Sequence, residues 1–266
     1  MKERPSFPLK LETVTQAKNK TVSTSPSWGA PGVGVEKKQI LSHAASGHGL
    51  DSEAVRANMV KRLVQSGLND EMVLSAMGRI PRHQFIDSAL ANQAYEDTSL
   101  PIGFGQTISK PNVVARMLEL LRQGRNLKIT GKLDKVLEIG TGCGYQAALL
   151  SQVANQVYSI ERIKGLYEKA KDNVRPLRLP NLHLLFGDGM SGYADGAPYA
   201  GIISAAGGDN IPGKWIDQLA IGGRIVAPVT TSAGLQSLTV IDKFEDRIEQ
   251  STLENVIFVP LKPGVI

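Results

Sequence analysis

The chain has 266 residues, and 42% of them are hydrophobic, a proportion typical of a globular protein with a sizeable core. Its net charge is +5, but residues 1–50 contribute +4 of this (seven basic residues against three acidic ones), so no basic folded face for nucleic acid is expected. The single cysteine, Cys143, excludes a disulfide framework and favours a reducing, cytoplasmic compartment. No apolar run is long enough to cross a membrane, so we expect no membrane partner.

The N-terminal segment differs in composition from the rest of the chain. Residues 1–50 are rich in Ser, Thr, Pro, Gly and Lys and lack an apolar period, so we predict a disordered extension. Order should begin near Asp51 or Ser52, since either residue can cap a helix. Asn69 or Asp70 should cap a second short helix. These helices are expected to pack as an N-terminal cap.

The next stretch, Asp97–Pro111, is predicted to be a loop. It holds two glycines, two prolines and several small hydroxyl residues, which disfavour a regular element. An apolar helix follows it, and Ser109 is well placed as the N-cap with Pro111 in the first turn. Alternatively, Ser109 contacts a substrate. The two roles are compatible because a hydroxyl both donates and accepts hydrogen bonds.

The stretch from Val136 to Tyr145 predicts a buried strand, a glycine-rich turn and the start of a helix. Its apolar residues suit a parallel strand covered on both faces. Gly140, Gly142 and Gly144 then alternate, so a ligand can lie directly against the backbone at the start of the helix. The pattern is E-x-G-x-G-x-G, beginning at Glu138. This spacing differs from the G-x-G-x-x-G of dinucleotide-binding folds and disfavours a dehydrogenase.

Two later carboxylates are expected at the same edge of the sheet. Glu161 ends the next apolar run, about twenty residues past the first glycine, where nucleotide folds place an acid for ribose hydroxyls. Asp188 follows the third strand, and we interpret it as a cofactor contact at the adenine rather than as a simple turn residue.

The remaining pattern alternates strands and helices. Strands are expected at residues 182–186, 199–204, 224–229 and 255–259, helices at 164–174 and 212–220, and a hairpin from residues 237–241 to Ile248 onward. This order predicts an α/β fold with a doubly wound, mostly parallel, Rossmann-like sheet. The domain would cover residues 51–266, with the helical cap at its start and the antiparallel hairpin near its end.

Two motifs carry a resemblance to a known family. The segment Val136–Tyr145 resembles motif I of S-adenosylmethionine-dependent methyltransferases. The segment Leu100–Pro111, ending in Gln106-Thr107-Ile108-Ser109, resembles the signature loop of the protein-L-isoaspartate O-methyltransferases. The resemblance spans Asp51 to Ile266, and the signature loop is its most specific part. Further matches lie at residues 159–163, 187–189, 212–228 and 258–261.

The resemblance implies a function, a cofactor and a set of site residues. The chain would be a protein-repair methyltransferase that moves a methyl group from S-adenosyl-L-methionine to the free carboxylate of L-isoaspartyl residues in damaged proteins. Ser109 would be the active-site residue. Cofactor contacts would come from Gly105, Gln106, Thr107, Glu138, Gly140, Thr141, Gly142, Cys143, Glu161, Arg162, Asp188 and Gly189. We expect no metal site, since the four histidines lack metal-ligand spacing. We also expect a monomer.

Some positions depart from the family pattern, and other functions are open. Ala200-Gly201 stands where Asp-Ala is common, Gly207-Gly208-Asp209 replaces a proline-containing run, and Cys143 replaces serine. These departures lie next to the expected pocket and bear on specificity. One alternative is a methyltransferase of the same fold that acts on a small molecule or RNA, but the aromatic–proline motif common there is replaced by Ser204-Ala205-Ala206-Gly207. Another is a non-catalytic protein that binds S-adenosylmethionine.

Overall fold

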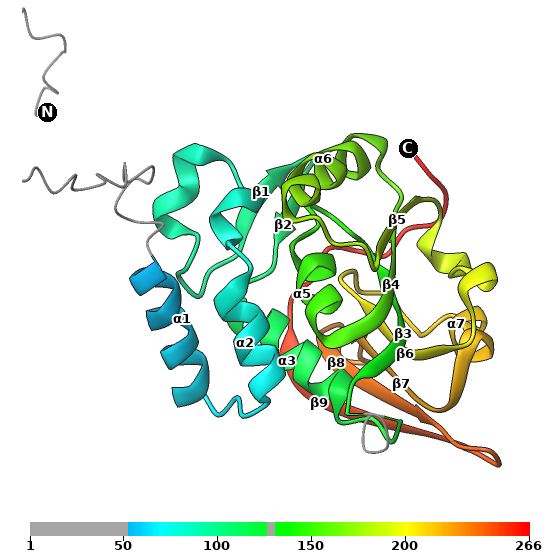
Figure 1. Cartoon of the computed structure of the whole chain (residues 1–266). Coiled ribbons are helices and arrows are strands. Elements are labelled where there is room, and N and C mark those ends of the chain that lie inside the picture. Colours follow the sequence, from blue (N-terminus) through cyan, green and yellow to red (C-terminus); the bar gives the residue numbers. More distant parts are fainter. Residues whose placement is uncertain (1–52, 127–130) are drawn as a thin grey trace, which may run out of the picture. The chain divides into compact units, whose positions relative to one another are not determined.

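The computed structural model describes residues 53–126 and 131–266, and its centre is a seven-stranded sheet (Figure 1). The strand order is β5-β4-β3-β6-β7-β8-β9. Five strands run parallel: β3 (Leu133–Ile139), β4 (Ala154–Glu161), β5 (Leu182–Phe186), β6 (Tyr199–Ser204) and β7 (Leu219–Thr230). The last two, β8 (Gln236–Lys243) and β9 (Ile248–Val256), are antiparallel and form the predicted hairpin. The predicted doubly wound, mostly parallel sheet is therefore confirmed.

Helices cover both faces of this sheet. The cap helices α1 (Glu53–Gln65) and α2 (Glu71–Arg79) pack with α3 (Pro111–Arg122), α5 (Tyr145–Val153) and α6 (Lys164–Val174) over one face. The short helix α7 (Gly213–Gln218) buries Trp215 on the other face. Five 3-10 turns connect these elements: η1 (Arg82–Phe85), η2 (Ser88–Gln93), η3 (Arg175–Leu177), η4 (Gly189–Ser191) and η5 (Ala194–Gly196).

Side chains of the parallel strands pack into the cores on both faces of the sheet, because successive residues of a strand point to opposite faces. In β3, Val136 joins the core beneath the larger helical layer, whereas Leu137 and Ile139 join the core beneath α7. All three side chains are at most 1% exposed. The unbroken apolar run that predicted this strand thus reflects burial on two sides.

The N-terminal predictions are partly tested. The disordered extension at residues 1–50 and the caps at Asp51 and Ser52 lie outside the described residues. The cap of the second helix is Asp70, whose side chain accepts hydrogen bonds from the Met72 and Val73 amides, both at 3.0 Å. Asp70 also binds Arg122 on α3, with Oδ2 and Nε 2.7 Å apart, and so fastens the cap to the main domain.

The prediction of a loop at Asp97–Pro111 is wrong, because part of this stretch is a small antiparallel hairpin. Strands β1 (Leu100–Gly103) and β2 (Gln106–Ile108) pair from Leu100↔Ile108 to Gly103↔Gln106. The turn holds Phe104 in a left-handed conformation, with φ of 54°. Leu100, Ile102 and Ile108 are buried, so packing against the domain stabilises two strands that are too short to be recognised by pattern.

Ser109 is not the N-cap of the following helix, contrary to that prediction. Helix α3 begins at Pro111, and the preceding residue, Lys110, makes no side-chain cap. The free amide of Asn112 instead donates to Asp97 Oδ1 at 2.9 Å. Pairing in β2 extends to Ile108, so Ser109 lies between strand and helix and a carboxylate from earlier in the chain caps α3.

The last predicted strand is also wrong. Strand β9 ends at Val256, and no separate strand covers residues 255–259. The chain leaves the sheet because other partners bind its backbone: Phe258 N donates to Gln236 Oε1 at 2.7 Å, and Gly207 N donates to Val259 O at 2.8 Å. This exit carries the following residues across the carboxyl ends of the parallel strands.

Candidate active site

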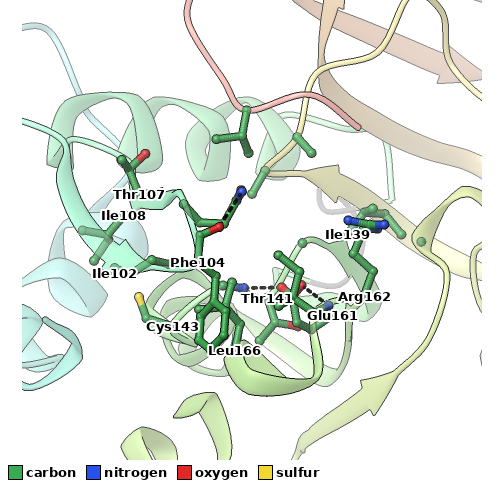
Figure 2. A pocket seen from close by; sticks show the side chains of 18 of the residues that line it. Ile102, Phe104, Thr107, Ile108, Ile139, Thr141, Cys143, Glu161, Arg162 and Leu166 are labelled. Carbon is green, nitrogen blue, oxygen red and sulfur yellow. Dashed lines mark hydrogen bonds between the residues drawn. The ribbon is translucent and has the colours of Figure 1, made fainter. Parts of the chain in front are cut away.

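A cavity of about 410 Å³ lies at the carboxyl ends of β3 and β4, beside the point where the chain direction across the sheet reverses between β3 and β6. Ligands of doubly wound folds bind at this switch point. The walls come from the β1–β2 hairpin, the glycine turn after β3, the end of β4, the loop after β6 and residues 259–266. Figure 2 shows the hairpin residues Ile102, Phe104 and Thr107 opposite Glu161 and Arg162.

All but two of the predicted site residues line this cavity. They are Gly105, Gln106, Thr107, Ser109, Gly140, Thr141, Gly142, Cys143, Glu161, Arg162 and Gly189. The exceptions are Glu138, which lies beneath the glycine turn, and Asp188, whose carboxylate faces backbone amides. The direct cofactor contacts expected from these two therefore lack support in the cavity geometry.

The glycine turn is built so that its backbone faces the cavity. Gly140 and Gly142 have φ values of +87° and +57°, a region that L side chains rarely adopt. The amides of Gly140 and Thr141 donate to Ile160 O at 2.9 and 3.1 Å, which ties the turn to β4. A β-carbon on Gly142 would also lie 3.2 Å from Ile102 Cδ1 of the hairpin. The turn therefore presents bare backbone to the cavity, and contact of a ligand with that backbone stays a prediction.

Glu161 ends β4 with its carboxylate at the cavity wall. Oε2 accepts from the Gly142 amide and Oε1 from the Ile163 amide, both at 2.8 Å. Figure 2 draws both bonds as dashed lines. Burial raises the pKa of Glu161, although these backbone bonds partly oppose the shift. Each carboxylate oxygen has further acceptor capacity, so Glu161 can also bind hydroxyl groups in the cavity.

Glu138 is fully buried below the turn. The Ser159 hydroxyl donates to its Oε2 and also shares a 2.6 Å hydrogen bond with Thr141 Oγ1. Burial raises the Glu138 pKa to about 8, against the opposing effects of Ser159 and Gln146. Within the described residues, Glu138 Oε1 and Gln146 Nε2 are nevertheless buried without a hydrogen-bond partner. The arrangement holds Thr141, and with it the turn, from below.

Cys143 has the properties of a packing residue. Its side chain is 3% exposed, and burial raises the pKa of its thiol to about 11. A thiol of this kind is protonated near neutral pH and is a poor nucleophile. Cys143 is therefore a small residue that packs in the turn and not a nucleophile.

Asp188 begins the 3-10 turn after β5 and lies outside the cavity lining. Oδ1 accepts from Met190 N at 2.9 Å, and Oδ2 accepts from Gly264 N at 2.8 Å. Its neighbour Gly189 does line the cavity, and the carbonyl of Gly189 accepts from the Trp215 indole N–H at 2.9 Å. The expected adenine contact of Asp188 stays a prediction.

A second cavity, of about 840 Å³, opens between α3, the β7–β8 turn and the end of β9. The two cavities have only Ser109 in common among the described lining residues. Two exposed apolar side chains lie along the second cavity, Leu235 at 56% and Ile257 at 98% exposure. Its basic side chains are paired: Lys110 lies 3.6 Å from Asp97, and Arg116 binds Glu119 and Glu254.

Several lining residues were not predicted. Ala205 and Ala206 follow β6, and Val259 to Lys262 follow the exit from β9. The carboxyl end of the fourth parallel strand was a usable signal for the alanines, because parallel strands place such ends at one edge. The departure at Ala200-Gly201 lines neither cavity, contrary to expectation. At Gly201 a β-carbon would lie 2.9 Å from Leu121 Cδ1, so close packing of α3 accounts for the glycine.

Within residues 53–126 and 131–266, no helix is long and apolar enough to span a bilayer. No group of three or more His, Cys, Asp or Glu side chains is placed to hold a metal ion there.

Comparisons with known proteins agree with this geometry. The family model described as Protein-L-isoaspartate(D-aspartate) O-methyltransferase (PCMT) matches residues 54–265. The protein-L-isoaspartate O-methyltransferase of Leptothrix cholodnii is 50% identical over 271 residues, which cover 98% of this chain and 95% of that protein. The enzyme of the same name from Methylibium petroleiphilum is 51% identical over 262 residues, covering 98% and 96%.

Solved structures show the same fold. One protein-L-isoaspartate O-methyltransferase superposes with a TM-score of 0.70 at 28% identity, covering 79% of this chain and 67% of that chain. A Plasmodium falciparum protein, described as a beta-aspartate methyltransferase (PCMT) in complex with S-adenosyl-L-homocysteine, has a TM-score of 0.65 at 22% identity, covering 78% and 98%. The chain therefore belongs to the protein-L-isoaspartate(D-aspartate) O-methyltransferase family, which uses S-adenosylmethionine.

Proposed function

We propose that this chain transfers the methyl group of S-adenosylmethionine to the free carboxylate of L-isoaspartyl residues in damaged proteins. The cofactor would occupy the cavity above the glycine turn, where the volume is in the range of small-molecule sites. The residues present fit it: bare backbone at Gly142 and an acceptor carboxylate at Glu161 suit an adenosine with ribose hydroxyls. The isoaspartyl segment would enter through the second cavity.

The junction of the two cavities at Ser109 carries this proposal. Methyl transfer requires that the donor and the acceptor meet, and two adjoining cavities that share Ser109 supply two approaches to one point. No hydrogen bond joins the Ser109 hydroxyl to another described residue, and the helix cap is provided by Asp97. The hydroxyl is therefore available to orient the acceptor carboxylate.

The chemistry needs alignment more than a general base. The methyl group is already activated on its sulfonium when the cofactor is bound. A carboxylate acceptor, with a pKa of about 4, is ionised at neutral pH. Correct positioning of two reactants can contribute about 7–11 kcal/mol. The site fits this requirement, because no histidine lines either cavity among the described residues.

Neutral donors suit an acceptor that must remain nucleophilic. A lysine clamp would hold the carboxylate firmly but would reduce its reactivity, whereas a hydroxyl orients it with less loss of charge. Lys110 and Arg116 line the groove near Ser109, but both already face carboxylates, at distances of 3.0 to 3.6 Å. The Ser109 hydroxyl, which lines both cavities, is thus the donor that we assign to the substrate, and the Thr107 hydroxyl lines the cofactor cavity beside it.

We further infer that one copy of the chain is sufficient. The glycine turn, Glu161 and Ser109, to which we assign cofactor and substrate, all come from the same chain. The lone cysteine supports a reducing compartment such as the cytoplasm. Sedimentation at working concentration tests the monomer, and a larger species that is required for activity would contradict it.

A methyl-transfer assay tests the function directly. Two peptides of identical sequence, one with L-isoaspartate and one with normal aspartate, are supplied with labelled S-adenosylmethionine. We expect methylation of the isoaspartyl peptide and almost none of its twin. Cofactor binding without methylation of either peptide would indicate a non-catalytic binding protein. Equal methylation of both would refute the proposed specificity.

A further inference from the structure

The second cavity, which we call the groove, carries charged side chains close to Ser109. Among the described residues that line it, Lys110 and Arg116 are basic and Glu254 is acidic. Lys110 directly follows Ser109 in the chain, and its ammonium group is a mobile point charge on a flexible stem. A free ammonium group here would bind the anionic acceptor that we assign to Ser109. The partner of Lys110 therefore bears on the reaction.

Each of the two cations faces a carboxylate. Arg116 binds Glu254 through Nε at 3.0 Å and Glu119 through Nη1 at 3.1 Å. Lys110 Nζ lies 3.6 Å from Oδ2 of Asp97, a residue that lines neither cavity. The side chains of Lys110 and Asp97 are 45% and 47% exposed, so their pairing is weak. An incoming carboxylate can thus capture the ammonium group once Asp97 loses its charge.

Asp97 is held in place from two sides. Its Oδ1 accepts from the amide of Asn112, in the first turn of α3, at 2.9 Å. The backbone around it is fixed by the fully buried side chain of Arg82, which donates from Nε to Ala94 O at 2.7 Å and from Nη2 to Thr98 O at 3.4 Å. One oxygen of Asp97 therefore caps the helix, while the other faces the ammonium group from a fixed position.

We propose that Asp97 is a positioning residue for methyl transfer, which holds the Lys110 ammonium group away from the acceptor carboxylate at Ser109. The inference rests on the proposed function for the identity of the acceptor. During transfer a carboxylate oxygen forms the bond to the methyl carbon, the carbon–sulfur bond breaks with its electron pair left on sulfur, and no proton moves. The acceptor thereby loses its negative charge.

This loss of charge determines what a misplaced lysine would do. An ion pair between Lys110 and the acceptor is strongest in the bound substrate and weakens as the acceptor is neutralised. It stabilises the ground state more than the transition state, so it lowers the half-saturating peptide concentration and the rate together. A defect in the fold of the groove would instead raise the half-saturating concentration.

One substitution separates the charge of Asp97 from its role as a cap. Asp97→Asn keeps an Oδ1 acceptor for the Asn112 amide but removes the negative charge beside Lys110. Asp87→Asn is the matched control, because Asp87 is an exposed aspartate that caps η2 through Ala89 N at 2.9 Å and lines neither cavity. Lys110→Gln provides a second background in which no ammonium group is available.

The experiment is single-turnover methylation of an isoaspartyl peptide at a series of peptide concentrations, with melting temperatures measured beside it. We expect Asp97→Asn to lower both the maximal rate and the half-saturating concentration by about two- to fivefold, the range of an exposed ion pair. The melting temperature should stay nearly unchanged, and added salt should reduce both effects. Asp87→Asn should change neither kinetic value. In the Lys110→Gln background, Asp97→Asn should also change neither.

Two results overturn the proposal. One is a maximal rate in folded Asp97→Asn equal to that of the wild type. The other is an equal loss of rate in the Lys110 and Gln backgrounds, which would show that Asp97 acts through the helix cap alone. The wild-type protein in the same assay reports on the proposed function: if it leaves the isoaspartyl peptide unmethylated, the function and this inference both fail, whereas an active wild type confines the failure to Asp97.

Discussion

Replacing Glu138 by glutamine should make the protein more stable than the wild type at alkaline pH. The wild-type carboxyl has a pKa of about 8 when folded, against an ordinary value of 4.5. Because the folded state binds the proton more tightly, its contribution to stability is complete below the unfolded pKa. That contribution is lost as the pH rises through the folded pKa. Glutamine is neutral at every pH and lacks this loss.

The structure sets the size of the effect. At 1.36 kcal/mol per pKa unit, the difference between 4.5 and about 8 amounts to an upper limit of about 5 kcal/mol. Between pH 5 and 8 the wild type should lose about 1.4 kcal/mol per pH unit relative to Glu138→Gln. Glu161 is present in both proteins, but its charge helps to raise the Glu138 pKa, so repulsion between the two carboxylates is part of the difference.

Denaturant unfolding of both proteins without cofactor, at intervals from pH 5 to pH 9, measures this difference. Ser159→Ala is a useful companion, because loss of the hydroxyl that lowers the Glu138 pKa should extend the decline to higher pH without changing its slope. If the stability profiles of wild type and Glu138→Gln stay parallel across this range, the Glu138 carboxyl does not have a raised pKa in the folded protein.

Three further predictions concern binding and organisation. Glu161→Ala should weaken S-adenosylmethionine binding by roughly 1.5–3 kcal/mol, about ten- to a hundredfold, in calorimetry, and unchanged affinity would remove Glu161 from the site. Ile257→Asp should raise KM for an isoaspartyl peptide about fivefold through charge repulsion of roughly 1 kcal/mol, whereas Ile221→Asp, at another exposed isoleucine outside the groove, should not. Equal changes of KM in the two variants would show that the groove does not bind the peptide. Deleting residues 1–50 should leave melting temperature and turnover nearly unchanged, and a large drop in either would show that the segment packs on the domain.

The sheet and the glycine turn were predictable because their signals are local. A strand buried on both faces is rich in apolar residues, and β3, β4 and β6 each bury such residues in the core. The glycines of the turn appear directly in the sequence, since glycine adopts positive φ values such as those at Gly140 and Gly142 without steric cost. Parallel topology then places the ends of these strands at one edge, which is why Gly142 and Glu161 meet.

The errors arose where distant residues determine the structure. The β1–β2 hairpin is only a few residues long, and burial of Leu100 and Ile102 stabilises it rather than any repeat in its sequence. Helix α3 looked as if Ser109 capped it, but Asp97 binds its Asn112 amide from fifteen residues away. These contacts depend on tertiary packing, which composition and spacing do not reveal.

The same contrast holds for the site: residues with a local sequence signal were predicted, and residues placed by tertiary packing were not. Glycines and acids that follow strands were found, whereas the lining residues after β9 were missed, because they reach the cavity only after the chain leaves the sheet. The partner of Asp188, Gly264, is likewise remote in sequence. The groove that meets the cofactor cavity at Ser109 is formed by α3, β8 and β9 together. No single segment of the sequence therefore carries a signal that predicts it.

Steady-state methylation of an isoaspartyl peptide by Ser109→Ala and Ser109→Asp, with cofactor affinity and melting temperature measured beside it, tests the role of Ser109 most directly. Because Asp97 caps α3, neither substitution should change stability by more than about 0.5 kcal/mol. We expect Ser109→Ala to retain intermediate activity and Ser109→Asp to bind cofactor but be nearly inactive, since it places a like charge against the substrate carboxylate. A folded Ser109→Asp protein with near wild-type turnover would contradict the assignment of Ser109 to the acceptor.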